Sequence, residues 1–499
     1  MTRFRWTDLE VRRALDMNLK RAREGLAFGG ISTDSRTVEP GDLFLALSGE
    51  NFQGHDFVSD ALAKGATGVV VSREVQADES TVIYPVDDTL LALGRLARHR
   101  RRALRARVVG ITGSSGKTTT KDLVAEVLRG SYKVHATPRN LNNRVGLPLT
   151  ILDAPDGTQV LVLEMGTNEP GEIQALAEVA EPEVGVITTV SETHLEKLGS
   201  LEGVLEEKLD LFRGLQLRGS GIVGDEPALL REQAAGLIQD LTVVGWTRDA
   251  HPDFRPQDAE ITQKGCYRFR WKDQQIQLGI PGRHSVQNAL LALAVASKLD
   301  VPAKDAARRA GKVRPRDMRS EIRGVGSLTL LLDCYNANPQ SVRAALELLE
   351  TVQVLGPRVA VLGSMLELGE EAPLLHRQVL EESLTRSLDL VVATGLFAEA
   401  AQWIQKPAHG PELIRARELP EAEEILQERL GGTEVVLLKA SRGVAMEQLV
   451  PGLEARFGSS APGGSRTAAS GRNSPADSGG RAEGSRKKAS TPAETGKGA

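Results

Sequence analysis

Short runs of β-branched and aliphatic residues alternate with longer amphipathic runs along most of this 499-residue chain. Between about Ala106 and Val313 the runs are, in order, RVVGIT, TTTKDLVAEVLRG, VLVLEMG, GEIQALAEVAE, VGVITTV and LEGVLEEKLDLFRGL. Strands that alternate with helices of this length are typical of a mostly parallel sheet covered by helices. We therefore predict a doubly wound α/β domain over residues 106–313.

The same alternation predicts a second α/β unit over residues 314–457, with strands at LTLLLDCY, RVAVLGSM, DLVVATG and EVVLLKAS. Residues 1–105 are less regular, although GDLFLAL and ATGVVVS predict strands and DFVSDALAKG a helix between them. The Arg-rich run LGRLARHRRRALRAR is predicted to be a solvated helix that connects the first two domains. The chain is long enough for about three domains, so we predict a three-domain α/β protein.

The segment 458–499 has almost no large apolar residues, and it carries seven basic and three acidic residues. Such a segment cannot bury enough apolar surface to offset its ordering entropy, so we predict a disordered basic tail. The whole chain has a net charge of −4 and no basic stripe in its body. We therefore expect no nucleic acid among its main partners.

The N-terminus, MTRFRWTDLEVRRALDMNLKR, lacks the apolar stretch of a secretory signal. The chain also lacks any run of about 18 uncharged apolar residues. Cys266 and Cys334 are the only cysteines, too few for a disulfide framework, and we predict that both are buried thiols. We expect a cytoplasmic monomer that does not insert into membranes.

The segment GITGSSGKTTTK, residues 110–121, carries the strongest functional signal. It follows a predicted strand, opens a predicted helix and fits most of the pattern GxxxxGK[ST], although Ile111 stands where the first glycine is expected. At such a loop, backbone N–H groups and the helix N-terminus face phosphate groups. Lys117 would neutralise the β- and γ-phosphates, and the Thr118 hydroxyl would bind Mg²⁺. The alternative is a Gly/Ser turn with an exposed lysine.

Polar residues follow two further strands of the predicted central sheet. Glu164 closes VLVLEMGTN and His194 follows VGVITTV, so both should lie on the rim that carries Lys117, where they could hold a metal. Singly, each is more typical of a solvated strand end or surface residue, but the phosphate loop favours a site. Lys208 lies among acidic residues on a predicted helix, a pattern typical of an exposed, ion-paired lysine.

Two other segments hold candidate recognition residues. In GIPGRHSVQNALLALAVA, the Asn288 amide has the donor and acceptor needed to read an adenine edge, although a well-packed helix explains the pattern equally well. In LLDCYNANPQS, Asp333, Asn336 and Asn338 follow a strand end, where polar side chains gather for recognition. A turn built by Asn and Pro is the alternative there.

Together, these segments resemble the Mur ligases, the ATP-dependent amide-forming enzymes of peptidoglycan precursor synthesis. The resemblance covers roughly residues 25–455 and includes STDSRTVEPGDLFLALSGENFQGHDF, TGSSGKTTTK, RNLNNRVGLPLTIL, LEMGTN, HLEKLGSLEGVLEEK, PGRHSVQNAL, DCYNANPQSVRAAL and VLGSMLELGEEAPLLHR. The YNANP and MLELGE segments are similar to the branch that joins D-alanyl-D-alanine to UDP-N-acetylmuramoyl-tripeptide. The loop without its first glycine fits the TGxxGKTT form of the family.

The resemblance implies a UDP-muramoyl substrate domain at residues 1–105, a central ATP-binding domain at 106–313 and a Rossmann-like ligase domain at 314–457. It implies an ADP-forming acid–amino-acid ligase whose partners are the UDP-N-acetylmuramoyl-tripeptide and D-alanyl-D-alanine. The implied cofactors are ATP, two Mg²⁺ ions and CO₂, bound as a lysine carbamate. The third residue of the tripeptide, diaminopimelate or lysine, stays open.

The resemblance also implies roles for individual residues. Catalysis would depend on Lys117, Glu164, His194 and Lys208. ATP would be bound by Gly113, Ser114, Ser115, Gly116, Lys117, Thr118, Thr119, Asn288, Arg319 and Asp333. The other substrates would be bound by Ser35, Arg36, Asn142, Asn143, Asn336 and Asn338. The metal ligands would be Thr118, Glu164, His194 and Lys208 as its carbamate, a role that replaces the exposed lysine which the pattern alone favours.

Several positions depart from the residues usual in this branch, among them Gln53, Thr189, Val190, Asp210, Ser364 and Ala440. The phosphate and metal residues are retained, so we expect activity. One alternative is a related ligase that adds another amino acid, including a cyanophycin-synthetase-like ligase. Another is a P-loop nucleotide-binding regulatory protein without ligase activity.

Overall fold

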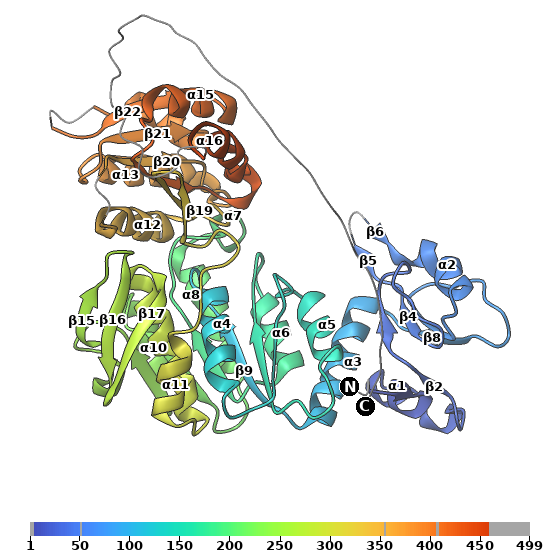
Figure 1. Cartoon of the computed structure of the whole chain (residues 1–499). Coiled ribbons are helices and arrows are strands. Elements are labelled where there is room, and N and C mark those ends of the chain that lie inside the picture. The colour runs from blue at the N-terminus through green and yellow to red at the C-terminus, as the bar shows by residue number, and fades with distance from the viewer. Residues whose placement is uncertain (1–3, 50–51, 354–355, 406–408, 459–499) are drawn as a thin grey trace, which may run out of the picture. The chain divides into compact units, whose positions relative to one another are not determined.

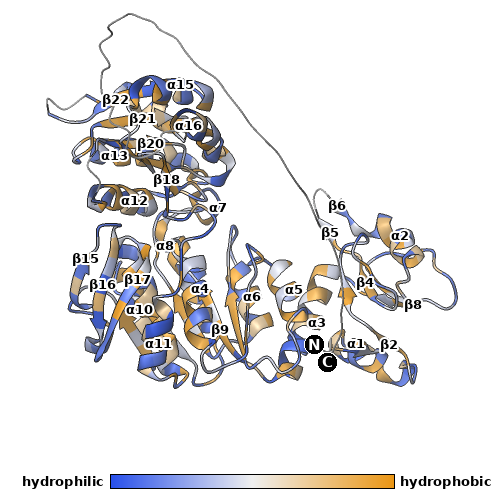
Figure 2. Ribbon diagram, in the orientation of Figure 1, coloured by the Kyte–Doolittle hydropathy of each residue, from blue (hydrophilic) through white to orange (hydrophobic). Residues whose placement is uncertain are grey.

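The structure is a computed structural model that describes residues 4–49, 52–353, 356–405 and 409–458 (Figure 1). The tail predicted for residues 458–499 lies outside the described residues except for Gly458. The chain forms three successive α/β units, whose main sheets have four, six and six strands. Apolar residues are concentrated on the strands and on the helix faces that cover them (Figure 2).

The first region contains a parallel four-stranded sheet in the order β3-β4-β7-β8. Its strands are β3 (Ile31–Ser32), β4 (Leu43–Leu45), β7 (Gly68–Val71) and β8 (Val82–Pro85). The predicted strands GDLFLAL and ATGVVVS contain β4 and β7, and the helix predicted between them contains α2 (Val58–Ala63). Two short antiparallel pairs accompany the sheet, together with α1 (Asp8–Ala14): β1 (Trp6–Thr7) with β2 (Ala27–Phe28), and β5 (Ser48–Gly49) with β6 (Phe52–Gln53).

The central sheet has six parallel strands in the order β10-β11-β9-β12-β13-β14. These are β9 (Arg107–Thr112), β10 (Val134–Ala136), β11 (Val160–Glu164), β12 (Val184–Ile187), β13 (Ser220–Gly224) and β14 (Leu241–Val244). The strand order changes direction beside β9, so the crevice at the carboxyl end of β9 is where a doubly wound sheet binds ligands.

Helices cover both faces of this sheet because successive side chains of a strand point to opposite faces. Val109 and Ile111 of β9 pack toward α4 (Lys117–Leu128) and α10 (Arg283–Lys298), whereas Val108 packs toward α6 (Glu172–Ala180) and α8 (Leu201–Arg213). The remaining helices are α5 (Gly146–Leu152), α7 (Leu195–Leu198), α9 (Ala228–Leu237) and α11 (Ala303–Ala310). A three-stranded antiparallel sheet follows α9, formed by β15 (Gln257–Ile261), β16 (Cys266–Trp271) and β17 (Gln274–Pro281).

The third sheet has the order β18-β19-β23-β20-β21-β22, with β18 antiparallel at one edge and the other strands parallel. Its strands are β18 (Glu321–Val325), β19 (Leu328–Asp333), β20 (Arg358–Leu362), β21 (Leu390–Thr394), β22 (Glu412–Ala416) and β23 (Val435–Lys439). Its helices are α12 (Pro339–Thr351), α13 (Ala372–Ser383), α14 (Leu396–Ala400), α15 (Leu419–Arg429) and α16 (Leu449–Phe457). This arrangement confirms the predicted Rossmann-like unit.

The Arg-rich helix differs from its prediction as a solvated connector. It is α3 (Thr89–Leu104), in which Arg100 and Arg101 are buried. Arg100 donates to the Ala154 carbonyl at 2.7 Å, and Arg101 donates to the Ala180 carbonyl at 2.9 Å. Guanidinium groups can satisfy buried carbonyls in this way because they present several N–H donors in one plane. The helix is therefore bonded to the loop after α5 and to the C-terminal end of α6.

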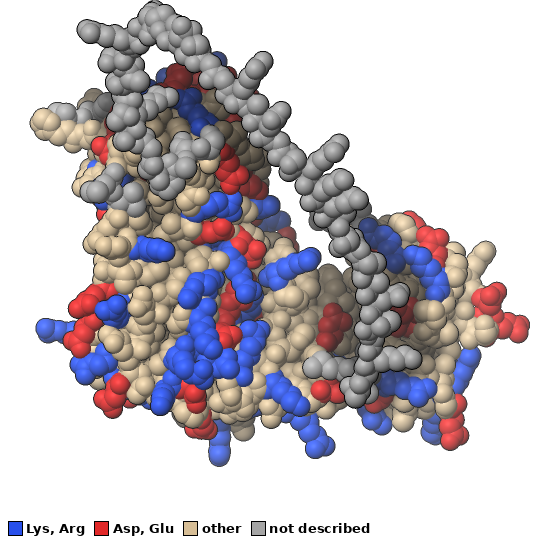
Figure 3. Space-filling view, in the orientation of Figure 1, with Lys and Arg blue, Asp and Glu red and all other residues tan. Residues whose placement is uncertain are grey.

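The surface charges, the two cysteines and the apolar content of the helices can be compared with the sequence predictions. Basic and acidic side chains are interspersed over most of the visible face (Figure 3). Cys334 is buried as predicted, whereas Cys266 is only partly buried, and burial raises the pKa of both thiols, that of Cys334 to about 11. Within the described residues, no helix is both long and apolar enough to cross a membrane.

Candidate active site

The phosphate loop connects β9 to α4, as the sequence predicts, and two of its glycines are required by their surroundings. Gly113 and Gly116 have φ values of 143° and 81°, which side chains rarely adopt. A Cβ atom on Gly113 would lie 2.0 Å from Thr188 Oγ1, and one on Gly116 would lie 2.6 Å from Asn288 Oδ1. The backbone therefore turns tightly into α4, and the first N–H groups of this helix are left for a ligand.

A cavity of about 630 Å³ opens at this loop. It collects most of the predicted site residues, namely Ser114, Ser115, Gly116, Lys117, Thr118, Thr119, Asn142, Asn143, Glu164, His194, Asn288, Arg319, Asp333 and Asn336. The remaining predicted residues do not line it, namely Ser35, Arg36, Gly113, Lys208 and Asn338. The volume is within the range typical of sites for cofactors and small ligands.

Lys117 begins α4, and its Nζ donates to the Gly113 carbonyl at 2.6 Å. Burial lowers the pKa of Lys117, the charge of Glu164 opposes this shift, and the charge of Arg319 reinforces it. Two cationic side chains, one on the loop and one from the segment before β18, therefore face the same space. Such a pair is suited to a polyanionic ligand such as a nucleoside triphosphate.

Glu164 ends β11 and is only 2% exposed. Its Oε1 accepts hydrogen bonds from Thr118 Oγ1 at 3.1 Å and Asn142 Nδ2 at 2.9 Å. Its Oε2 is buried and has no hydrogen-bond partner in the described part of the chain. A buried carboxylate oxygen without a partner is costly unless a cation binds it, so Glu164 and Thr118 fit a metal site.

A metal ion at Glu164 and Thr118 would not be held in a cage of protein ligands. Among residues 4–49, 52–353, 356–405 and 409–458, no three His, Cys, Asp or Glu side chains cluster in a way that could hold a metal ion. Mg²⁺ is commonly bound by one or two protein oxygens together with water and substrate phosphates. A carboxylate and a hydroxyl beside a phosphate loop therefore suit Mg²⁺ better than a metal that needs a full protein cage.

Lys208 lies on α8 and is completely buried, so the exposed, ion-paired lysine favoured by the pattern alone is wrong. Its Nζ has no hydrogen-bond partner among the described residues. Burial lowers the pKa of Lys208 well below its ordinary value, and the charge of Lys117 lowers it further. Burial therefore favours the uncharged amine, the form that can react with CO₂ to give an anionic carbamate.

His194 immediately precedes α7 and has a left-handed backbone with a φ of 53°. Its Nδ1 lies 2.6 Å from Glu367 Oε2, and this hydrogen bond lowers the pKa of the Glu367 carboxyl. A bond of this kind fixes the imidazole orientation and leaves Nε2 for another partner. His194 also lines the cavity.

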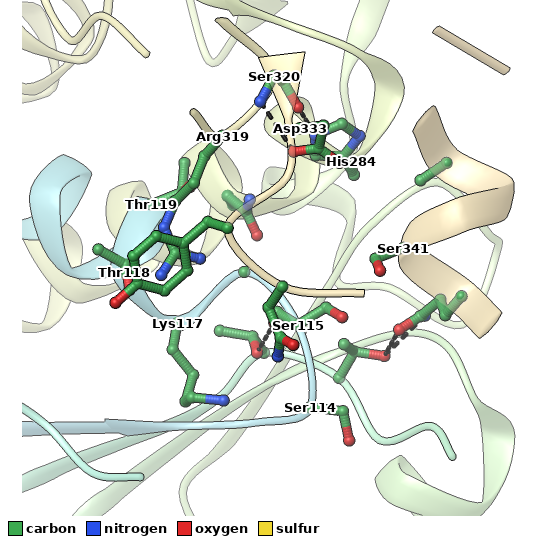
Figure 4. Close-up of a pocket in the computed structure, with 18 of the residues that line it drawn as sticks. Ser114, Ser115, Lys117, Thr118, Thr119, His284, Arg319, Ser320, Asp333 and Ser341 are labelled. Carbon is green, nitrogen blue, oxygen red and sulfur yellow. Dashed lines mark hydrogen bonds between the residues drawn. The ribbon is translucent and has the colours of Figure 1, made fainter. Parts of the chain in front are cut away.

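The third α/β unit contributes the residues at the end of β19. Asp333 Oδ1 accepts from the Ser320 backbone N–H at 2.9 Å, and Asp333 Oδ2 lies 2.7 Å from Lys439 Nζ. Figure 4 shows Asp333 joined to Ser320 beside His284. Asn336 is exposed, whereas Asn338 is buried and caps α12 by accepting from the Ser341 backbone N–H at 2.8 Å.

Asn338 also reaches the phosphate loop, because its Nδ2 donates to Ser115 Oγ at 3.0 Å. Asn143 has a comparable structural role, since its Oδ1 accepts from the Gly146 backbone N–H at 2.8 Å at the start of α5. In the first region, Arg36 lies on the surface, and its Nε and Nη2 bind the Asp34 carboxylate at 2.9 and 2.7 Å. This pairing lowers the pKa of Asp34 to about 2.

Sequence reasoning missed several residues that line the cavity, namely Glu172, Glu226, Trp246, Tyr335, Arg343, Arg386 and Lys439. Trp246 follows the end of β14, and the Arg283 guanidinium lies 4.9 Å from the centre of its ring. The residues before it, LTVVG, are a strand followed by a glycine. This pattern places Trp246 on the ligand-binding rim of the sheet. Tyr335 follows Asp333 by two residues, so the same rule applies to it.

Three family models match the chain in succession. The "Mur ligase family, catalytic domain" matches residues 28–101, the "Mur ligase middle domain" matches 111–296, and the "Mur ligase, glutamate ligase domain" matches 318–442. Together they span most of the described residues.

Known proteins are similar to the chain over nearly the same length. The UDP-N-acetylmuramoyl-tripeptide–D-alanyl-D-alanine ligase of Bacillus subtilis is 37% identical over 430 residues, which cover 85% of this chain and 93% of that protein. The Escherichia coli protein of the same name is 34% identical and covers 86% and 94%, respectively.

Solved structures agree with these sequence comparisons. A crystal structure of MurF from Acinetobacter baumannii matches with a TM-score of 0.82 at 30% identity, covering 91% of this chain and 100% of the other. MurF from Thermotoga maritima in complex with ADP matches with a TM-score of 0.77 at 28% identity, covering 86% and 97%.

Proposed function

Because the chain belongs to the Mur ligase family, we propose that it joins D-alanyl-D-alanine to UDP-N-acetylmuramoyl-tripeptide, with ATP converted to ADP and phosphate. The single observation that carries this proposal is one cavity in which the phosphate loop meets the unpartnered carboxylate oxygen of Glu164. P-loop switches also pair the loop with a carboxylate that holds Mg²⁺, so the similarity to tripeptide ligases over 85% of this chain is what favours acid activation over a switch. The reaction belongs to peptidoglycan precursor synthesis, which we place in the cytoplasm.

The chemistry requires activation because an amine does not attack a carboxylate at neutral pH. The tripeptide carboxylate first attacks the γ-phosphorus, so that ADP leaves and an acyl phosphate forms. The free amine of D-alanyl-D-alanine then attacks the acyl carbon, and inorganic phosphate leaves from the tetrahedral intermediate. Lys117 and Arg319 stabilise the phosphoryl charge in both steps, because they supply fixed positive charge where negative charge develops.

We assign Thr118 and Glu164 to Mg²⁺, with His194 and the Lys208 carbamate beside them as further ligands. Bound Mg²⁺ would neutralise phosphate charge and orient the γ-phosphate. The burial of Lys208, which lowers the pKa of its amine, supports this assignment, because a carbamate forms only on an unprotonated amine. A carbamate on Lys208 would add anionic oxygens, and these oxygens could bind the cation in this buried position.

The recognition roles stay proposals of the same kind. Asn288 and Asp333 would contact the nucleoside part of ATP. Ser35 and Arg36 would lie near the UDP end of the substrate, with Asn142, Asn143, Asn336 and Asn338 near the peptides. Three of these asparagines also make structural hydrogen bonds: Asn142 to Glu164, Asn143 at the start of α5, and Asn338 at the start of α12. Substituting any of them would therefore disturb the local structure as well as any substrate contact. The predicted domain limits and the monomeric state stay predictions.

The acceptor dependence of phosphate release tests the proposal. Purified protein receives ATP, Mg²⁺ and UDP-N-acetylmuramoyl-tripeptide, with either lysine or diaminopimelate as the third residue, and D-alanyl-D-alanine or other amino acids are added in turn. We expect stoichiometric phosphate and amide product with D-alanyl-D-alanine, and neither with the Lys117→Ala variant. Phosphate release with a different amino acid would reassign the acceptor. ATPase activity that ignores both substrates would rule out the ligase.

A further inference from the structure

The backbone around Arg319 is held in an unusual conformation. Its neighbours Asp317, Met318 and Ser320 have φ values of 55°, 53° and 52°, in the left-handed region that non-glycine residues rarely adopt. Each such residue costs on the order of 1 kcal/mol, so the conformation persists only where its surroundings enforce it. Clustered strain of this kind is typical of sites whose side chains must be preorganised.

Three successive residues at the end of β19 hold this segment. Asp333 accepts a hydrogen bond from the Ser320 backbone N–H at 2.9 Å, and Cys334 Sγ lies 3.8 Å from Met318 Sδ. The third residue, Tyr335, carries the Arg319 guanidinium above its ring, 3.8 Å from the ring centre. Residues 333, 334 and 335 thus contact residues 320, 318 and 319, respectively.

The stacked guanidinium of Arg319 has an N–H donor that makes no hydrogen bond within the described residues. Arg319 Nε is buried and has no hydrogen-bond partner among the described residues, although Arg319 lines the cavity. In Figure 4 the side chain extends toward Thr118 and Thr119 at the start of α4. A guanidinium that stacks on a ring keeps all its N–H donors in the plane of the stack, where they remain available to phosphate or ribose oxygens.

We propose that Tyr335 is a positioning residue, whose ring fixes the plane of the Arg319 guanidinium so that its in-plane N–H groups face the bound nucleotide. This inference rests on the proposed ATP site and names a residue to which that proposal gave no role. The ring, not the hydroxyl, does this, because the hydroxyl makes no hydrogen bond with any described residue. Without the ring, Arg319 would have to be ordered by the nucleotide itself, and affinity would fall by the cost of that ordering.

The test compares Tyr335→Phe, which keeps the ring, with Tyr335→Leu, which removes it. Titration calorimetry with ADP and ATP, in the full-length protein and without the peptide substrates, measures binding independently of the ligase reaction. We expect Tyr335→Leu to weaken binding about three- to tenfold, the range of a partly buried cation–π contact, and Tyr335→Phe to restore it. Equal affinities for the wild type and Tyr335→Leu would overturn the proposal.

A double-mutant cycle separates positioning from direct contact. In the Arg319→Gln background, Tyr335→Leu should cause no further loss, because there is no guanidinium left to align. An equal loss in both backgrounds would mean that the ring itself touches the nucleotide and would overturn the positioning role. The Arg319 Nε–H resonance supplies a second readout, since the aromatic ring current should shift it in the wild type and Tyr335→Phe but not in a folded Tyr335→Leu.

A failure of the proposed function gives a different result. If amide formation is absent while the nucleotide affinities follow the pattern above, the ligase assignment is wrong and the positioning role stands. If the wild type binds neither ADP nor ATP, both are overturned together.

Discussion

Lys208 Nζ and Glu164 Oε2 are among the buried polar atoms that have no hydrogen-bond partner in the described part of the chain. Each lowers stability, because burying a polar group without a hydrogen bond costs free energy. Neither is explained by packing, since an apolar residue of the same size would avoid the cost. We propose that a carbamate and a bound cation account for both atoms.

Replacing Lys208 with methionine tests this argument. Lys208→Met keeps the length of the side chain and removes the unpaired amine, so the thermal midpoint should stay equal or rise. Ligase activity should fall by roughly 100-fold, the loss typical of removing one electrostatic group from a site. Differential scanning fluorimetry and the phosphate assay measure the two effects.

Lys298→Met is the matched control, since Lys298 lies on α10 in an ion pair with Asp240 and does not line the cavity. It should leave ligase activity unchanged. In Lys208→Ala, which leaves space for a small acid, formate or acetate should restore part of the activity. A Lys208→Met protein with full activity, or one that unfolds many degrees lower, would contradict the functional role.

At the residue scale, strand-end reasoning placed Glu164, His194 and Asp333 close together, because the carboxyl ends of parallel strands meet on one edge, and all three line the cavity. Their roles stay predictions. It could not predict hydrogen-bond partners. The Asn338 amide caps α12 and bonds Ser115, a contact between residues more than 200 positions apart. The burial of Lys208 had a signal in the sequence: it lies three or four positions from Val204, Leu205, Leu211 and Phe212, on the apolar face of α8.

At the element scale, alternating patterns predicted the buried strands and the long helices but not all their limits. The Arg-rich helix begins at Thr89, before the predicted run, because the Asp88 side chain accepts from the Leu90 and Leu91 backbone N–H groups. The antiparallel strands β15, β16 and β17 were not predicted. All five residues of β15 are exposed, so this strand shows no apolar alternation for a pattern to detect.

The contact between α1 and β8 makes a pH-dependent prediction at this scale. Asp8 on α1 accepts hydrogen bonds from Tyr84 Oη and from the Arg23 backbone N–H, both at 2.6 Å, and forms an ion pair with Arg12, whose Nε lies 2.9 Å from Asp8 Oδ1. Burial acts to raise the pKa of Asp8, but these hydrogen bonds and the Arg12 charge lower it overall. A carboxyl with a lowered pKa contributes stability above its unfolded pKa, and the contribution is lost as pH falls through the folded pKa.

Asp8→Asn should therefore be less stable than the wild type at pH 7, by about 1 to 3 kcal/mol, the cost of leaving buried partners unsatisfied. The difference should shrink as pH falls below about 4, the usual pKa of an aspartate. Hydrogen exchange of the α1 and β8 amides across this pH range measures the effect locally. Tyr84→Phe, which removes one of the two hydrogen bonds to Asp8, should give a smaller loss. A difference that grows toward acid pH would contradict the assignment of Asp8 as an ionised acceptor.

At the scale of the whole molecule, the cavity is assembled from segments that are distant in sequence, including residues 114–119, 164–168, 280–288 and 333–347. No local pattern contains that assembly. The fold class followed from alternation alone, whereas the pairing of the phosphate loop with the YNANP segment came from the family resemblance. The comparisons then confirmed the family and the three-domain architecture.

The central claim is that the γ-phosphate held at Lys117 is transferred to a peptide carboxylate, and oxygen-isotope transfer tests it most directly. The reacting carboxylate of UDP-N-acetylmuramoyl-tripeptide is labelled with ¹⁸O, and the inorganic phosphate formed with ATP and D-alanyl-D-alanine is analysed by mass spectrometry. Attack of the carboxylate on phosphorus, followed by loss of phosphate from the acyl carbon, predicts one ¹⁸O atom in each phosphate. Phosphate that carries no ¹⁸O, while the amide product forms, would contradict the acyl-phosphate route and with it the role assigned to this site.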